Sequence, residues 1–165
     1  MSKETLGIIG LGYVGLPLAL AFGKKMNVIG YDLKKKRVNE LNYRIDSNNE
    51  FNKELKNKNK KVIFTNSEKL LNKCNVFIIT VPTPIKKNNN PDLIYLKKAS
   101  HTIGKHIKKN STVILESTVY PSCTENFCIP IIEKTSKLKL NKDFYCGYSP
   151  ERINPGDKKN NFNNM

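Results

Sequence analysis

Gly10-Leu11-Gly12-Tyr13-Val14-Gly15 separates two apolar runs near the start of the 165-residue chain. Its glycines follow the pattern GxGxxG, which is typical of a tight turn between a buried strand and a helix. Gly10 permits the turn, Gly12 lets the backbone approach a pyrophosphate, and Gly15 lets the helix pack closely on the strand. The free N–H groups and the positive helix end favour a phosphate by about 0.3–2 kcal/mol. Taken alone, the pattern also fits a glycine-rich turn in another α/β protein.

An acidic residue stands at the end of the next apolar run. Asp32 follows Tyr31 about twenty residues beyond the glycines, where a carboxylate accepts hydrogen bonds from both adenosine ribose hydroxyls of a dinucleotide. A carboxylate there repels a 2′-phosphate, so the sequence predicts NAD rather than NADP as the cofactor. Residues 34–37 are all basic, and a basic residue near the ribose is the usual device for binding NADP. We interpret the three lysines among them as the solvated first turn of a helix.

Short apolar runs alternate with helical stretches along the chain, which is the pattern of βαβ units in a parallel sheet. Strands are predicted at Leu6–Gly10, Val28–Tyr31, Val62–Thr65, Val76–Val81, Thr112–Glu116 and Phe144–Tyr148. Helices are predicted to begin near Tyr13, Lys34, Ser67, Asp92 and Ser122. The expected fold class is α/β, a Rossmann-like doubly wound parallel sheet in the order 3-2-1-4-5-6, with ligands at the carboxyl ends of strands one and four. The stretch 46–61 is interpreted as a solvated helix and loop.

The formal net charge of +15 raises the question of nucleic-acid binding. The cations are Lys apart from Arg37, Arg44 and Arg152, and they are scattered among Asn residues. Because nucleic-acid surfaces favour clustered Arg alongside Lys, we expect no nucleic-acid partner. A basic, non-enzymatic binding module remains an alternative.

The sequence contains four cysteines. They are Cys74, Cys123, Cys128 and Cys146. They form no CxxC pair and have no partnering histidine spacing, so no metal site is predicted. Cys123 stands at a predicted helix start, where a thiolate is favoured, but we do not assign it as a nucleophile. The other three are interpreted as small buried hydrophobes.

The nearly uncharged stretch 5–23 has the length of a signal peptide or a membrane span. Its early glycines, the interrupting Pro17 and the following Lys24 and Lys25 argue against both. We therefore expect a cytoplasmic protein without a membrane partner.

Four further segments go beyond a generic dinucleotide-binding domain. They are Val81-Pro82-Thr83-Pro84-Ile85, Pro91-Asp92-Leu93, Glu116-Ser117-Thr118-Val119-Tyr120-Pro121 and GYSPERINPGD at 147–157. Together with the opening GLGYVGLPLA, they resemble the UDP-glucose and UDP-N-acetylhexosamine 6-dehydrogenase family of nucleotide-sugar dehydrogenases. The run SPERINPGD is most similar to members acting on N-acetylated UDP-sugars (UDP-N-acetylglucosamine or galactosamine) in capsule or O-antigen synthesis. The resemblance covers the chain from Leu6 to Lys159.

The resemblance implies an oxidoreductase that uses two NAD molecules in turn to carry the sugar C6 alcohol through an aldehyde to a carboxylate. The partner is then a UDP-sugar, and the parent enzyme is a homodimer or a larger assembly. The implied cofactor-binding residues are Gly10, Gly12, Tyr13, Val14, Gly15, Asp32, Arg37, Thr83 and Thr118. The implied catalytic residues are Thr118, which helps hold the catalytic water, and Glu151, the base for thioester hydrolysis. Glu151, Arg152 and Ile153 are the implied substrate-binding residues.

Without the resemblance, two of these positions have plainer interpretations. Glu151 is then as readily a surface carboxylate paired with Arg152. Thr118 is then an ordinary β-branched residue at the end of a strand.

The sequence also departs from the family. Members usually have Gly and Thr after the proline of the ESTVYP segment, whereas this chain has Ser122 and Cys123, and a side chain there is expected to crowd the cofactor. Members continue into a central helix and a second domain that supplies the nucleophilic cysteine. We therefore expect an NAD-binding domain over 1–157, a disordered or truncated tail over 158–165, and no turnover by this chain alone. A fragment of another Rossmann NAD-dependent dehydrogenase remains an alternative, and the UDP-sugar epimer stays open.

Overall fold

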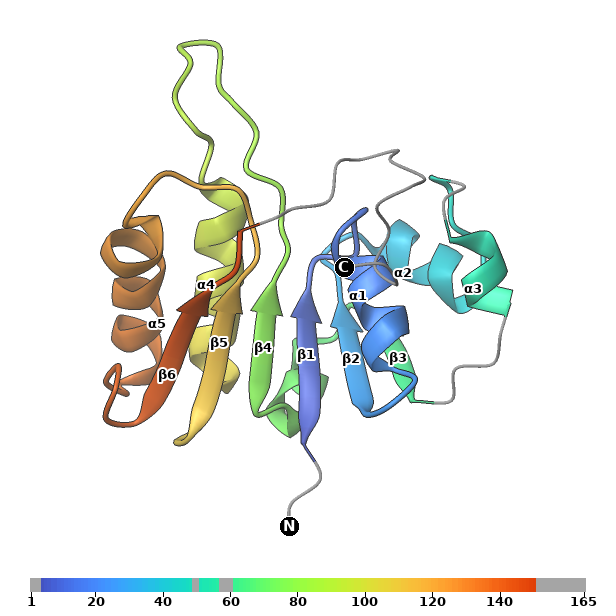
Figure 1. Cartoon of the computed structure of the whole chain (residues 1–165), viewed down its shortest axis with the longest axis horizontal. Helices are drawn as coiled ribbons and strands as arrows, with labels where there is room; N and C mark the ends of the chain where they lie inside the picture. Colours follow the sequence, from blue (N-terminus) through green and yellow to red (C-terminus); the bar gives the residue numbers. More distant parts are fainter. Residues whose placement is uncertain (1–3, 49–50, 57–60, 151–165) are drawn as a thin grey trace.

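The computed structural model describes residues 4–48, 51–56 and 61–150, and within them a single parallel sheet organises the chain (Figure 1). Its strands are β1 (Thr5–Ile9), β2 (Asn27–Tyr31), β3 (Val62–Thr65), β4 (Val76–Ile79), β5 (Ser111–Leu115) and β6 (Phe144–Tyr148). Their order is β3-β2-β1-β4-β5-β6, and every neighbouring pair is parallel. The predicted fold class and strand order are confirmed.

Helical segments connect the strands. They are α1 (Gly15–Phe22), α2 (Lys35–Asn42), α3 (Asn52–Lys56), the 3₁₀ segment η1 (Glu68–Lys73), α4 (Ile94–His106), the π-helical turn η2 (Thr124–Cys128) and α5 (Ile129–Ser136). Each predicted helix start lies within two residues of an observed one. The connection from β3 to β4 is a 3₁₀ segment rather than an α-helix, and a π-helical turn precedes α5.

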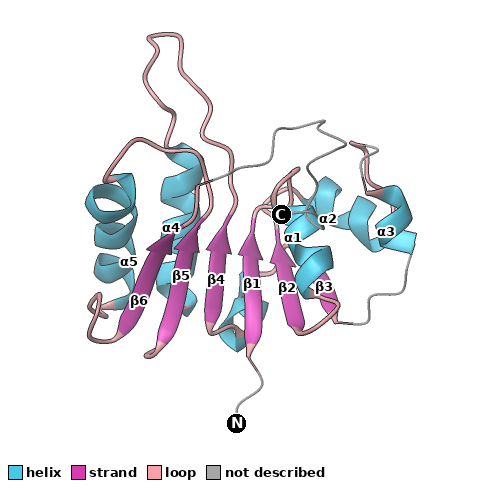
Figure 2. Ribbon diagram, in the orientation of Figure 1, coloured by secondary structure: helices cyan, strands magenta, loops and turns pink. Residues whose placement is uncertain are grey.

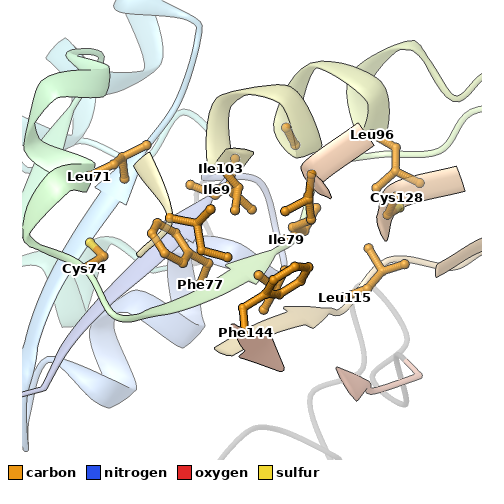
Figure 3. Close-up of a cluster of buried hydrophobic side chains, with 14 of the residues drawn as sticks. Ile9, Leu71, Cys74, Phe77, Ile79, Leu96, Ile103, Leu115, Cys128 and Phe144 are labelled. Atoms are coloured by element: carbon orange, nitrogen blue, oxygen red, sulfur yellow. The ribbon is translucent and has the colours of Figure 1, made fainter. Parts of the chain in front are cut away.

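Alternating side chains of the central strands supply two hydrophobic clusters. Ile8 of β1 and Ile78 of β4 belong to the cluster that contains α1 residues, whereas Ile9 and Ile79 belong to the cluster that contains residues of α4 and α5. Figure 3 shows the second cluster around Phe77. Because successive strand residues point to opposite faces, near-continuous apolar strands are buried on both sides.

Two residues in the described parts of the stretch 46–56 are more buried than the sequence predicts. A short helix, α3, is present in this stretch, but Leu55 packs into the α1-side cluster and Asp46 is completely buried. The prediction is wrong for these two residues, because Leu55 joins the hydrophobic cluster and Asp46 forms an ion pair with Arg37 of α2.

Parallel strands bring the loops that follow β1, β2, β4 and β5 to one edge of the sheet. In Figure 2 the arrowheads of these strands point to this edge, and the loop after β4 extends well beyond it. The cofactor-binding residues that the sequence predicts follow β1, β2, β4 and β5, so the topology collects them at this carboxyl edge.

Candidate functional site

The turn after β1 is closed by contacts that only glycine permits at two positions. Gly10 has a φ of +102°, in the region that disfavours side chains, and its N–H donates to the Tyr31 carbonyl at 2.8 Å. A β-carbon on Gly15 would lie 1.9 Å from the Gly10 carbonyl oxygen. The same oxygen accepts a hydrogen bond from Thr80 Oγ1 at 2.8 Å. The first and third glycines are therefore required by the packing of the turn itself.

Gly12 has a different environment. A β-carbon at this position would meet no atom within 4 Å. The neighbouring Tyr13 is exposed and Val14 is half-buried, so the start of α1 opens onto free space. Protein packing does not demand a glycine here, whereas a ligand passing close to the backbone does. This open cradle fits a pyrophosphate.

Asp32 joins the turn to the start of α2. Its Oδ2 accepts the Leu11 N–H at 2.8 Å, and its Oδ1 accepts the Lys34 N–H at 2.8 Å. The carboxylate is therefore held beside the glycine turn by two backbone donors. Lys34, Lys35 and Lys36 are exposed, as the sequence predicts for a solvated first helical turn.

Arg37 is tied to the same turn and to a buried acid. Its Nε donates to the Leu11 carbonyl at 2.9 Å, and its Nη1 donates to Asp46 Oδ1 at 2.7 Å. Burial alone would raise the pKa of Asp46, but hydrogen bonds from Arg37 and from the Phe51 N–H outweigh it and lower the pKa below its ordinary value. Asp46 was missed in the sequence because it lies in an Asn-rich stretch without a motif.

A cavity of about 450 Å³ lies between the glycine turn, the end of β2 and one side of α4. Its walls include Gly10, Gly12, Asp32, Arg37, Tyr95 and Lys98. Its size falls within the range of roughly 300–1,000 Å³ found for small-molecule sites. The structure thus brings together four of the predicted cofactor residues and adds a wall from α4, which no sequence motif indicates.

Thr83 and Thr118 lie apart from this cavity but next to each other. Thr83 Oγ1, in the loop after β4, donates to the Thr118 carbonyl at 2.5 Å, and Thr118 follows β5. Ser117 strengthens the same junction, because its hydroxyl donates to the Val81 carbonyl at 2.8 Å. The two predicted threonines therefore form one contact at the carboxyl edge, while Glu151, Arg152 and Ile153 lie outside the described residues.

The thiols are poorly suited to nucleophilic chemistry. Cys74, Cys123 and Cys128 are buried, and burial raises the pKa of Cys74 and of Cys128 to about 12. Burial also raises the pKa of Cys123, which disfavours a thiolate at this position. Cys146 is only partly buried, so its interpretation as a buried hydrophobe is wrong, because it lies on the edge strand β6.

Two kinds of feature are absent from the described residues. Among residues 4–48, 51–56 and 61–150, no group of three or more His, Cys, Asp and Glu side chains is placed to hold a metal ion. No helix in this described part of the chain has the length and apolar character needed to cross a membrane.

A parallel sheet in this order, a glycine turn that leaves open space at the start of α1, and an acid at the end of β2 define a dinucleotide-binding domain of the Rossmann type. Sequence comparison identifies the family. The model of the NAD binding domain of the UDP-glucose/GDP-mannose dehydrogenase family matches residues 4–165, so the chain belongs to that family and its cofactor is NAD.

Two curated relatives show how much of a family member the chain represents. It is 52% identical to a UDP-N-acetyl-D-glucosamine 6-dehydrogenase of Pseudomonas aeruginosa, a match covering 96% of this chain and 38% of the relative. It is 50% identical to Protein CapL of Staphylococcus aureus, covering 97% of this chain and 38% of the relative. The chain thus spans less than two fifths of the length of these relatives.

Solved structures agree with the fold. The UDP-D-ManNAc dehydrogenase of Pyrococcus horikoshii superposes with a TM-score of 0.87 at 34% identity, over 93% of this chain and 37% of that one. A ternary complex of GDP-mannose dehydrogenase from Pseudomonas aeruginosa superposes with a TM-score of 0.84 at 30% identity, over 90% and 36% of the two chains.

Proposed function

We propose that this chain is the NAD-binding portion of a nucleotide-sugar 6-dehydrogenase that oxidises the C6 hydroxyl of a UDP-N-acetylhexosamine, or of UDP-glucose, to a carboxylate with two NAD. The activity named for the 52%-identical relative from Pseudomonas aeruginosa, UDP-N-acetyl-D-glucosamine 6-dehydrogenase, supports the N-acetylated substrate. NAD, when bound, supplies the hydride acceptor for such an oxidation.

The observation that carries the proposal is the pairing of an open main-chain turn with a fixed acid. The Asp32 carboxylate accepts the Leu11 N–H at 2.8 Å, one residue from the unobstructed Gly12. A pyrophosphate over Gly12 and a ribose at Asp32 are adjacent parts of one dinucleotide. Gly12 and Asp32 both line the cavity of about 450 Å³.

The other predicted cofactor-binding residues are assigned to parts of NAD according to where they lie. Gly10 and Gly15 shape the turn, and Tyr13 and Val14 flank the pyrophosphate. Arg37 lies on the adenosine side, where its Nε is held by the Leu11 carbonyl.

The edge formed by Thr83 and Thr118 is assigned to the nicotinamide side. The Thr83–Thr118 hydrogen bond fixes two loops that follow neighbouring strands, which suits a surface that must orient a reacting ring and a water molecule. Glu151 remains our candidate base, and Arg152 and Ile153 our candidate substrate contacts.

Several expectations stay predictions. These are the division into a domain over 1–157 and a tail over 158–165, the cytoplasmic location, the absence of a nucleic-acid partner, and an assembly of two or more copies.

The proposed function is tested by the number of NADH molecules formed for each UDP-sugar consumed. The full-length enzyme that contains this chain as its NAD-binding portion is supplied with NAD and, separately, with UDP-N-acetylglucosamine, UDP-N-acetylgalactosamine and UDP-glucose, and NADH is followed by absorbance. We expect two NADH for each UDP-sugar consumed with at least one of the three. Absence of NADH with all of them would overturn the proposal. Salt-sensitive DNA binding that persists in Asp32→Ala, without NAD binding, would favour the basic binding module instead.

A further inference from the structure

A basic side chain stands close to the acid that is expected to hold the ribose. Arg37 lines the same cavity as Asp32, and Lys34 and Lys36 line its rim. Basic residues in this position are the usual means of binding the 2′-phosphate of NADP. The cavity therefore combines one feature that favours NAD with another that ordinarily favours NADP.

The charge compensation of Arg37 resolves this conflict, while its buried Nη2 has no hydrogen-bond partner among the described residues. Its Nε is committed to the Leu11 carbonyl at 2.9 Å, and its Nη1 to Asp46 at 2.7 Å. The Arg37 side chain is 11% exposed and that of Asp46 is 0% exposed, so the pair is largely shielded from water. Glu40, at 3.9 Å from Arg37 Nη1, adds a second negative charge on the cavity side.

Asp46 is itself rigidly held. Its Oδ2 accepts the Phe51 N–H at 3.1 Å, and its backbone N–H donates to Asn52 Oδ1 at 2.7 Å. Its carboxylate therefore has a fixed position, and it draws the Arg37 guanidinium into a buried, charge-compensated contact.

We propose that Asp46 is a specificity-determining residue: by neutralising the charge of Arg37 and holding its Nη1, it weakens the attraction of this arginine for a 2′-phosphate and so favours NAD over NADP. The proposal rests on the proposed cofactor site and deepens it, since it assigns part of the discrimination to a residue outside the cavity wall. Asp32 then repels the phosphate directly, while Asp46 removes the cation that would otherwise attract it.

Removing the Asp46 charge should change the affinity for NADP and the affinity for NAD by different factors, whereas general damage to the site would weaken both equally. In Asp46→Asn the amide is close in shape, but the Arg37 charge is then compensated only by the more distant Glu40, at 3.9 Å, in a poorly hydrated position. A 2′-phosphate bound in this cavity then interacts with a less compensated positive charge, whereas the 2′-hydroxyl of NAD gains little. The dissociation constants of the two cofactors must therefore change by different factors.

The experiment measures the Kd of NAD and of NADP for the whole chain by calorimetric titration. In Asp46→Asn we expect the ratio of the NADP Kd to the NAD Kd to fall about tenfold relative to the unmodified chain. Asp143→Asn is the matched control, because Asp143 is also ion-paired, to Lys109 at 3.2 Å, but lies before β6 at the opposite edge of the sheet. The ratio should not change in that variant.

The double variant Arg37→Gln/Asp46→Asn removes both charges and keeps the test decisive if the single variant does not fold. We expect the ratio of the NADP Kd to the NAD Kd in this double variant to return to within about twofold of that of the unmodified chain. The reason is that the Arg37–Asp46 pair has no net charge and therefore attracts the phosphate little. A clearly higher ratio in the double variant would show that Arg37 already attracts the 2′-phosphate and would overturn the proposal. Equal weakening of both cofactors in Asp46→Asn would also overturn it. Failure of the unmodified chain to bind either cofactor would instead contradict the proposed function.

Discussion

The Gly10 carbonyl oxygen occupies the space into which a side chain on Gly15 would project, 1.9 Å from the position of its β-carbon. Thr80 Oγ1, 2.8 Å from the same oxygen, fixes that carbonyl in place and would itself lie 2.5 Å from the added carbon. The spacing of the first and third glycines is therefore a packing requirement of β1, β4 and α1. The middle glycine is under no such constraint.

Gly15→Ala should destabilise the fold. The added methyl group meets backbone and a hydrogen-bonded hydroxyl, neither of which can move freely, so we expect a loss of about 3 kcal/mol or more in the free energy of unfolding. Urea denaturation measures this change. Gly147→Ala, where no atom lies within 4 Å of the new carbon, is the control and should differ from the unmodified chain by less than about 0.5 kcal/mol. Equal stability of Gly15→Ala and Gly147→Ala would contradict the described turn.

Gly12→Val should separate binding from stability. The valine side chain enters open space, so the free energy of unfolding should stay within about 0.5 kcal/mol of the unmodified value. The same side chain blocks the approach of a pyrophosphate to the backbone, so the Kd for NAD should rise by at least about a hundredfold. Calorimetric titration and urea denaturation of one preparation give both numbers. A variant that binds NAD normally would place the pyrophosphate elsewhere.

Much of this architecture is predictable from local sequence signals. The near-continuous apolar runs specify buried parallel strands, and the glycine spacing together with Asp32 predicts both the turn and its place at the carboxyl edge. Asp46 is different, because its burial depends on an arginine nine positions earlier that a helix presents to it. The wall contributed by Tyr95 and Lys98 also depends on how α4 crosses the sheet, which sequence periodicity does not specify.

Ser122→Gly should stabilise the protein. Ser122 has a φ of +63°, a left-handed conformation that costs a residue with a side chain about 1–2 kcal/mol. Glycine removes that cost but loses more chain entropy on folding, which leaves an expected gain of about 0.5–1 kcal/mol. Thermal unfolding tests the prediction, and a lower melting temperature for Ser122→Gly would count against it.

Glu68 should contribute stability that is lost in acid. Burial raises the pKa of its carboxyl, but Lys105 at 3.2 Å and the hydroxyl of Thr102 outweigh burial and hold the pKa below its ordinary value. Because the folded-state pKa is lower than the unfolded one, this stability is present above the unfolded pKa and disappears as the pH falls through the folded pKa.

We therefore expect the unmodified chain to lose more free energy of unfolding than Glu68→Gln when the pH is lowered from about 7 to about 3. Denaturation at a series of pH values provides the comparison. Parallel pH profiles for the two proteins would exclude Glu68 as a source of the acid sensitivity.

The central claim is that the turn around Gly12 and the carboxylate of Asp32 together hold NAD, and titration of the folded chain with NAD tests it most directly. The account predicts saturable heat, a rise in melting temperature with NAD concentration, and at least about tenfold weaker binding in Asp32→Ala, because ribose hydrogen bonds to a charged group are lost. A chain that is folded by circular dichroism and yet gives neither heat nor a melting shift with NAD would contradict it.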